Sequence, residues 1–195
     1  RHGDAELLEL LLKEGAIINQ QDLQGLNALM LAVTGKHLAA VQLLLAHDAA
    51  VDATDKIGSS ALMRAALQDN VEMIAALCQG GATVDSTDGN GRTALLLAAA
   101  KGNAGAADVL LRAGAQPNQA DTYGWTPLMR AASWGHADVV DRLLRHGAEV
   151  DHAAADGKTA VMVATWYGHA DVVARLVAAD ADLGAATADG ETVMS

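Results

Sequence analysis

Residues 121–153 read DTYGWTPLMRAASWGHADVVDRLLRHGAEVDHA and carry the signals of a turn followed by two short helices. Asp121 to Gly124 suit the turn, because aspartate can accept hydrogen bonds from the backbone just ahead and glycine adopts a positive φ freely. The Thr126-Pro127 pair suits the N-cap and first position of a helix. Ala137 to Arg145 have apolar residues at helical spacing, which predicts a second helix over these residues, and Gly147 then turns the chain back.

A glycine returns at the same point of this pattern every 33 residues. The glycines are Gly25, Gly58, Gly91, Gly124, Gly157 and Gly190. A fixed period of this length is typical of a solenoid, in which each repeat packs only on its neighbours. We therefore expect one array over residues 1–195. Its predicted repeats are 22–54, 55–87, 88–120, 121–153 and 154–186, with partial repeats at 1–21 and 187–195.

The two ends of the sequence do not fit whole repeats. Terminal repeats of solenoids usually carry polar caps, and neither end shows one. We therefore expect this chain to be a segment of a longer array or a trimmed product. Apolar residues at both ends lack a stacking neighbour in this frame, which also predicts weak self-association. They are Leu7, Leu8, Leu11, Val193 and Met194.

Small residues recur on the first helix of every repeat, and larger aliphatic residues recur on the second. The small ones are Ala32, Ala65, Ala98, Ala131 and Ala164. They allow neighbouring repeats to approach closely, and a larger side chain there would cost roughly 1–3 kcal/mol through overpacking. The second helices are expected to supply the core, as with Val139 and Val140.

The stretch from Asp121 to His136, followed by Val139-Val140, Leu143-Leu144 and Gly147-Ala148, resembles an ankyrin repeat. The other copies resemble it as well, so the resemblance covers essentially the whole chain. It implies an all-α solenoid of stacked helix-turn-helix pairs with β-hairpin fingers. It also implies a non-catalytic scaffold that binds a partner protein or peptide on the concave surface formed by hairpins and first helices.

The chain departs from the family pattern at the histidine that usually follows the Thr-Pro-Leu triplet. Met30, Met63, Leu96, Met129 and Met162 stand in its place. Because thioethers fill irregular gaps well, we expect apolar packing to replace the histidine's hydrogen bond.

All five aromatic residues lie between positions 123 and 167. Tyr123 and Trp125 are predicted at a hairpin tip, and Trp134, Trp166 and Tyr167 at the ends of first helices. Helical spacing places Arg130 and Val163 on the same face. Exposed aromatic residues beside arginine are typical of binding hot spots. The alternative is that the rings only fill the ridge between hairpin and helix and exclude water.

The chain has a net charge of −11, yet cations gather on the predicted binding surface. They are Lys56, Arg64, Arg92, Lys101, Arg130 and Lys158, against Asp55, Asp88, Asp121 and Asp156. Six cations and four anions leave about +2 there. We therefore predict a partner with apolar anchors and some acidic residues, although these charges could instead simply solvate the face.

The predicted partner-binding residues fall into two groups. The anchors are Trp125, Arg130, Trp134, Trp166 and Tyr167, and the surrounding rim is Tyr123, Arg64, Arg92, Lys101 and Lys158. The same array could alternatively be a regulatory or substrate-docking segment of a larger enzyme or channel.

No catalytic, metal or cofactor site is predicted. His37, His136 and His169 belong to repeat turns, and one cysteine cannot build a zinc site. An acidic chain opposes nucleic-acid binding, and the apolar runs are too short for membrane insertion. Cys78 falls at a core position, and a single cysteine favours a reducing, cytoplasmic compartment.

Overall fold

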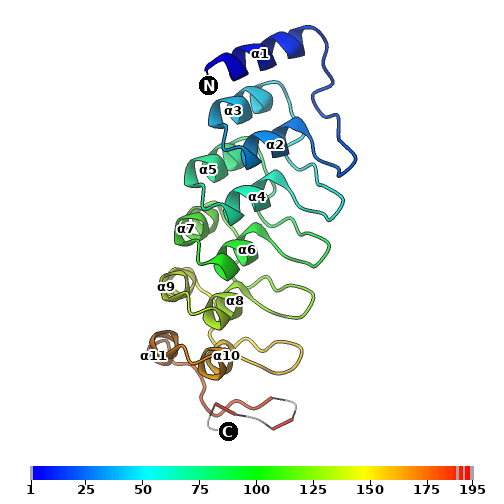
Figure 1. Cartoon of the computed structure of the whole chain (residues 1–195). Helices are drawn as coiled ribbons and strands as arrows, with labels where there is room; N and C mark the ends of the chain where they lie inside the picture. The colour runs from blue at the N-terminus through cyan, green and yellow to red at the C-terminus, as the bar shows by residue number, and fades with distance from the viewer. Residues whose placement is uncertain (1, 188, 191, 194–195) are drawn as a thin grey trace.

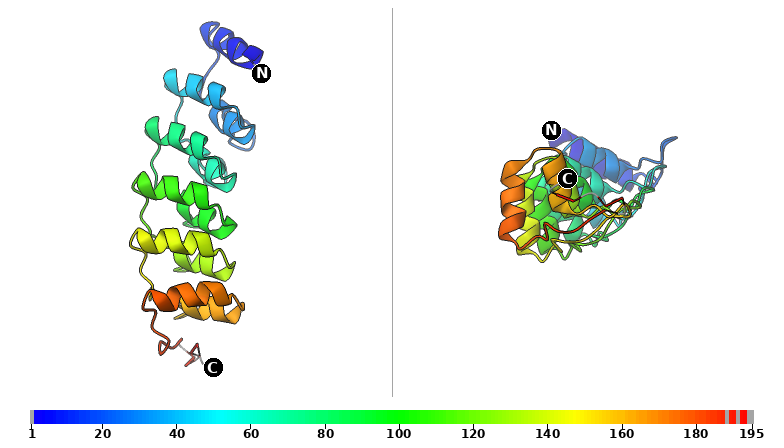
Figure 2. Two further views of the ribbon diagram at one scale, coloured as in Figure 1. Left: turned by 90° about the vertical axis from the view of Figure 1, so that its left-hand side faces the viewer. Right: turned by 90° about the horizontal axis from the view of Figure 1, so that it is seen from below.

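The computed structural model describes residues 2–187, 189–190 and 192–193, and these form a stack of helical hairpins (Figure 1). The first helices of the repeats form one row and the second helices another (Figure 2). The first helices are α2 (Ala28–Thr34), α4 (Ala61–Leu67), α6 (Ala94–Lys101), α8 (Pro127–Ser133) and α10 (Ala160–Trp166). The second helices are α1 (His2–Lys13), α3 (Leu38–Ala46), α5 (Val71–Gln79), α7 (Ala104–Arg112), α9 (Ala137–Arg145) and α11 (Ala170–Ala178).

The predicted solenoid is confirmed, and α9 begins and ends at the residues that the sequence predicts. The loops that join each second helix to the next first helix project from the stack, and we call them fingers (Figure 1). In the described part of the chain they contain no regular strand. Isolated bridges pair Thr54 with Ser60 and Ala186 with Thr192. The described fingers therefore follow the path of a hairpin, but they are held by turn hydrogen bonds rather than by a sheet.

Each first helix begins at a polar N-cap residue. The Thr126 hydroxyl accepts a hydrogen bond from the Met129 backbone N–H at 3.3 Å, and Pro127 follows it as predicted. Asn27, Ser60 and Thr93 cap α2, α4 and α6 in the same way. A cap of this kind stabilises a helix by typically about 1 kcal/mol, which matters for helices of only seven or eight residues.

The core runs along the contact between the two rows of helices. Leu44, Leu77, Leu110, Leu143 and Leu176 are the same position of successive second helices, and all are fully buried. The recurring alanines of the first helices are buried too. Met30, Met63, Leu96, Met129 and Met162 also lie inside, so apolar side chains do fill the place of the family's histidine.

Helix α1, which lies at one end of the stack, leaves part of its apolar face exposed. Leu7 and Leu11 are exposed as predicted. Leu8 is not, because it packs against the core, and Leu10 is exposed instead. Val193 also packs against the core, and Met194 lies outside the described residues. The set of residues predicted for self-association is therefore corrected at Leu8 and Val193.

Backbone geometry repeats with the sequence period even where the residue type changes. Gly102, Gly135 and Gly168 end first helices with a positive φ, and Lys36 and Asp69 adopt the same conformation at the equivalent positions. After the second helices, Asp48 and Asp180 replace glycine in the same way. A left-handed conformation costs a residue with a side chain roughly 1–2 kcal/mol. The stack therefore imposes this turn whatever the residue.

Side-chain hydrogen bonds also link the loop after each second helix to the corresponding loop of the next repeat. Asn19, Asp52, Asp85, Asn118 and Asp151 recur every 33 residues, and each accepts a bond from a backbone N–H in the following repeat. The distances from oxygen to nitrogen are 2.8–3.0 Å. These bonds fix the spacing between repeats and so the spacing of the fingers.

Candidate protein-binding surface

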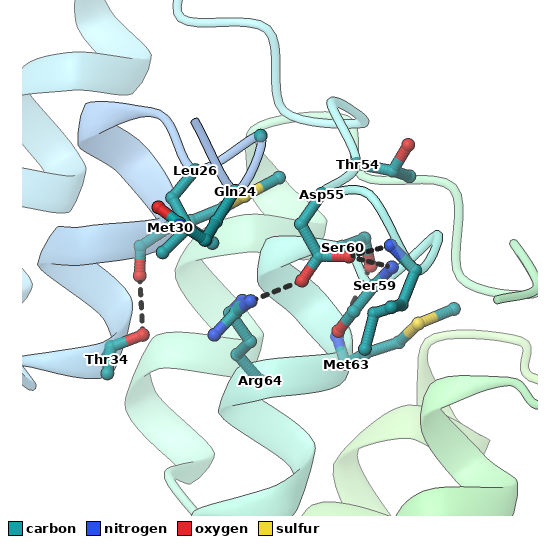
Figure 3. Close-up of polar contacts among 12 residues, drawn as sticks. Gln24, Leu26, Met30, Thr34, Thr54, Asp55, Ser59, Ser60, Met63 and Arg64 are labelled. Atoms are coloured by element: carbon teal, nitrogen blue, oxygen red, sulfur yellow. Dashed lines mark hydrogen bonds and ion pairs between the residues drawn. The ribbon is translucent and has the colours of Figure 1, made fainter. Parts of the chain in front are cut away.

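Four of the five complete fingers turn around an aspartate whose carboxylate holds the backbone of the tip. In the second complete repeat, Asp55 Oδ1 accepts hydrogen bonds from Ile57 N at 3.0 Å and Ser59 N at 2.8 Å (Figure 3). Asp22, Asp88 and Asp121 hold their fingers through the same two bonds. In the last complete repeat Ala154 occupies this position.

Three of these carboxylates are also paired with an arginine. Arg64 Nη2 lies 2.5 Å from Asp55 Oδ2 (Figure 3), and Arg92 Nη2 lies 2.7 Å from Asp88 Oδ2. Arg130 pairs with Asp121 in the same manner, through both Nε and Nη2. Arg64 and Arg130 reach back from the first helix, nine residues after their aspartates. Arg92 comes from the finger itself, four residues after Asp88.

The paired aspartates are buried, with 6%, 2% and 1% of the side chains of Asp55, Asp88 and Asp121 exposed. Burial by itself would raise the pKa of Asp88. The hydrogen bonds from the Arg92 side chain and from the backbone of Arg92 and Asn90 outweigh it, and they hold the pKa of this carboxyl below its ordinary value. The main role of these arginines is therefore to pair with the buried aspartates of their own repeats.

This pairing changes where the predicted positive charge of the surface lies. Arg64, Arg92 and Arg130 are each neutralised by a buried carboxylate, and Lys158 Nζ lies 2.6 Å from Asp156. Lys56 and Lys101 are exposed, and neither forms an ion pair within the part of the chain that is described. The surplus of about +2 predicted from the count of charges therefore rests on these two lysines.

The structure brings four of the predicted residues together. Trp125, Arg130, Trp134 and Tyr167 line one shallow pocket of about 360 Å³, together with Ser133 and His169. The Arg130 guanidinium lies 4.7 Å from the ring centroid of Trp125, and the Tyr167 ring stacks on that of His169 at 6.4 Å. Because α8 supplies one wall and the end of α10 the other, the pocket spans two adjacent repeats.

The remaining predicted residues lie apart from this pocket. Trp166 and Lys158 line a separate pocket of about 300 Å³ with Met162, and Tyr123 stands at a finger tip beside Asp156. Arg64, Arg92 and Lys101 line neither of these two pockets. Arg64 lines a pocket between the first two complete fingers instead.

Four of the five aromatic side chains are largely solvent-exposed. Tyr123, Trp134, Trp166 and Tyr167 expose 67%, 64%, 75% and 59% of their surface. Trp125 differs, because it is half-buried and packs against the core. Val163 does not share the face as predicted, since it is buried in the stack. We refer to the four exposed rings together with Trp125 as the aromatic patch.

A second apolar region on the same surface was not predicted. Leu23 and Ile57 are 83% and 67% exposed at the first two complete fingers, and Leu31 and Leu67 are exposed on α2 and α4. We call these four residues the aliphatic patch. Leu23 and Ile57 line a pocket of about 470 Å³ with Lys56 and Arg64. The repeat frame held the signal, because Ile57 is equivalent to Tyr123 and Leu67 to Trp166.

The finger tips are joined to one another through their backbones. Lys56 N donates to Gln24 O at 3.1 Å, and Gly89 N donates to Ile57 O at 3.1 Å. Thr122 N bonds Asn90 O at 3.1 Å, and Ala155 N bonds Tyr123 O at 3.3 Å. The five complete fingers thus form one continuous hydrogen-bonded row, on which the two patches are fixed relative to each other.

Two histidines of the repeat turns have structural roles. Nε2 of His136 lies 3.3 Å from Ala100 O, and Nε2 of His169 lies 3.2 Å from Ser133 O, so each joins its repeat to the one before. Over the described residues, His, Cys, Asp and Glu side chains form no cluster of three or more that could hold a metal ion. None of the described helices has the length and apolar character needed to span a membrane.

Comparison with known proteins agrees with this geometry. Among solved structures, the ankyrin repeat domain of Bcl-3, a member of the IkappaB protein family, is similar to this chain with a TM-score of 0.88 and 26% sequence identity. The match covers 97% of this chain and 86% of that one. A search among curated proteins found no significant match.

The sequence pattern itself identifies the family. The family model described as "Ankyrin repeats (3 copies)" matches residues 1–88 and 95–187, which is nearly all of the sequence. Domains of this family are generally protein–protein interaction modules and are typically non-catalytic. The chain belongs to the ankyrin repeat family.

Proposed function

We propose that this array is an interaction scaffold that binds a partner protein or peptide on the surface formed by its fingers and first helices. The observation that carries the proposal is the pocket between α8 and α10, around which Trp134 and Tyr167 expose most of their rings. Large exposed apolar groups that gather on one face usually mark an interaction site. Aromatic side chains around a pocket are also the commonest binding hot spots.

The pocket is already shaped to receive a side chain. Arg130 is held on one side by Asp121 and lies against Trp125 on the other. Because these contacts fix the floor of the pocket, a partner would not have to order it on binding, and pre-ordering favours affinity. The proposed anchors are therefore Trp134 and Tyr167 on the walls and the Trp125–Arg130 pair on the floor, with Trp166 and Tyr123 beside them.

Binding of peptides selected on the intact chain tests this proposal. Twelve-residue peptides enriched from a random phage-displayed library would be measured against the wild type and against a Trp134→Ala/Tyr167→Ala variant. We expect the double substitution to weaken binding at least tenfold, since two hot-spot side chains are removed. Val177→Ala on α11 is the matched control, because it truncates an exposed apolar residue on a second helix. Equal binding by wild type and the double variant would refute the proposal.

A further inference from the structure

The exposed apolar groups of the binding surface are divided between its two ends. The aliphatic patch occupies the repeats at 22–54 and 55–87, and the aromatic patch those at 121–153 and 154–186. Between residues 72 and 122, all of them described, no large apolar side chain is exposed. There the finger tip presents Gly89 and Asn90, and Leu97 of α6 is buried.

The gap between the patches is polar, and Lys101 ends α6 inside it. The second unpaired lysine, Lys56, lies at the tip of the second complete finger, where it lines the pocket of Leu23 and Ile57. The carboxylates of the second and third complete fingers, Asp55 and Asp88, are buried and already paired with arginines. The two lysines thus leave a local positive charge on this surface, although the whole chain has a net charge of −11.

This order is the reverse of that in an ordinary interface between folded domains. Such interfaces have an apolar centre and a polar rim. A folded partner centred on this surface would place the apolar centre of its own interface against Lys101 and the exposed backbone at Gly89. A linear segment with an apolar group at each end would instead place both groups on the patches and its middle over the lysines.

We propose, on the basis of the function proposed above, that the ligand is one extended peptide segment with two apolar anchors separated by an acidic stretch. One anchor occupies the pocket at Leu23 and Ile57, and the other the pocket at Trp134 and Tyr167. The acidic stretch crosses Lys56 and Lys101, whose charge it complements.

The stack fixes the distance that this segment must span. The two pockets are three repeats apart, and packed helices lie about 8–10 Å from each other, so the separation is roughly 24–30 Å. An extended chain rises about 3.3 Å per residue. The anchors are therefore about seven to nine residues apart. Joining two weak anchors on one chain raises affinity by about 10²–10⁴ when the linker matches the span.

Selection from a random library of 20-residue phage-displayed peptides on the intact chain tests this assignment. Enriched peptides are expected to share two apolar clusters about seven to nine residues apart with acidic residues between them. For a synthetic enriched peptide, deleting four spacer residues should weaken binding at least tenfold. Leu23→Ser/Ile57→Ser and Trp134→Ala/Tyr167→Ala should each do the same, whereas the control Val177→Ser should not. All these positions are exposed, and thermal unfolding would verify that each variant remains folded.

The outcomes separate this inference from the function on which it rests. If enriched peptides depend on Trp134 and Tyr167 but bind the Leu23→Ser/Ile57→Ser variant equally well, the two-anchor ligand is refuted and the scaffold function stands. An uncharged or basic spacer, or a Lys56→Glu/Lys101→Glu variant that binds as tightly as the wild type, also overturns it. Peptides that depend on neither patch, or no enrichment at all, would refute both.

Discussion

Arg130 lies between Trp125, whose ring centroid is 4.7 Å from the guanidinium carbon, and the buried carboxylate of Asp121. The arginine thus connects the finger to the first helix of its repeat and also forms part of the pocket floor. Its position explains why a residue counted among the cations of the predicted binding surface is largely committed to its own repeat.

Replacing Arg130 by methionine should destabilise the chain by roughly 2–3 kcal/mol, because it leaves the buried Asp121 carboxylate without its charge partner. Urea unfolding followed by tryptophan fluorescence would measure this, since all three tryptophans lie in the repeats at 121–186. Adding Asp121→Asn should recover part of the loss. Lys158→Met is the control, because it removes an exposed pair worth less than about 1 kcal/mol. Equal losses for the two single variants would contradict the prediction.

The Asp88–Arg92 pair should make the free energy of unfolding depend on pH in the acidic range. The pKa of Asp88 is lower in the folded chain than its unfolded value of about 3.9. The contribution of the ionised Asp88 to the free energy of unfolding is therefore complete above the unfolded pKa. This contribution is lost as the pH falls through the folded pKa. The difference in unfolding free energy between wild type and Asp88→Asn should accordingly shrink from pH 7 to pH 3. Urea titrations at pH 7, 5 and 3 would measure it, and a constant difference would disprove the link.

Lys36→Gly should stabilise the chain by about 0.5–1 kcal/mol, because it relieves a left-handed backbone at the modest entropic cost of a glycine. Asp48→Gly should act likewise. Both residues have a φ of 59° at positions where other repeats of the stack have glycine. Thermal unfolding would measure the gain. Lys36→Ala serves as the control, since it removes the same side chain without freeing the backbone, and an equal gain from it would rule out the backbone explanation.

Cys78 should react slowly with thiol reagents in the folded chain. Burial raises the pKa of its thiol, so little of the reactive thiolate is present at neutral pH. Alkylation at pH 8 should be slower than for a free cysteine and should rise to that rate in concentrated urea. Native alkylation as fast as that of free cysteine would show that the side chain is accessible. The result would bear on the prediction that Cys78 packs at a core position, which the structure shows only partly buried.

The sequence predicted those parts of the structure that depend on neighbours along the chain. The cap at Thr126, the bounds of α9 and the period of the stack follow from local residue types, and each is confirmed. The exposure of Trp134 and Trp166 was also predictable, because neither falls in the stripe that stacks on adjacent repeats.

The sequence alone could not predict which opposite charge each charged side chain pairs with. Arg64 and Arg130 lie on the first helices as the period predicts, but their aspartates are nine residues earlier, and the fold of the finger over the helix brings them together. Trp125 is half-buried against the core and also lies against Arg130. The aliphatic patch was missed for another reason: single exposed leucines are common, and only their shared position on one surface gives them meaning.

The row of bonds between finger tips involves only main-chain atoms, from Gln24 through to Ala155. Amide and carbonyl groups are the same in every amino acid except proline, which lacks the N–H. Ile57, Asn90 and Tyr123 can therefore be exchanged for other residues while the tips keep their alignment. Natural or engineered substitutions at these three positions can therefore change what the surface binds while the hydrogen-bonded row of fingers is kept.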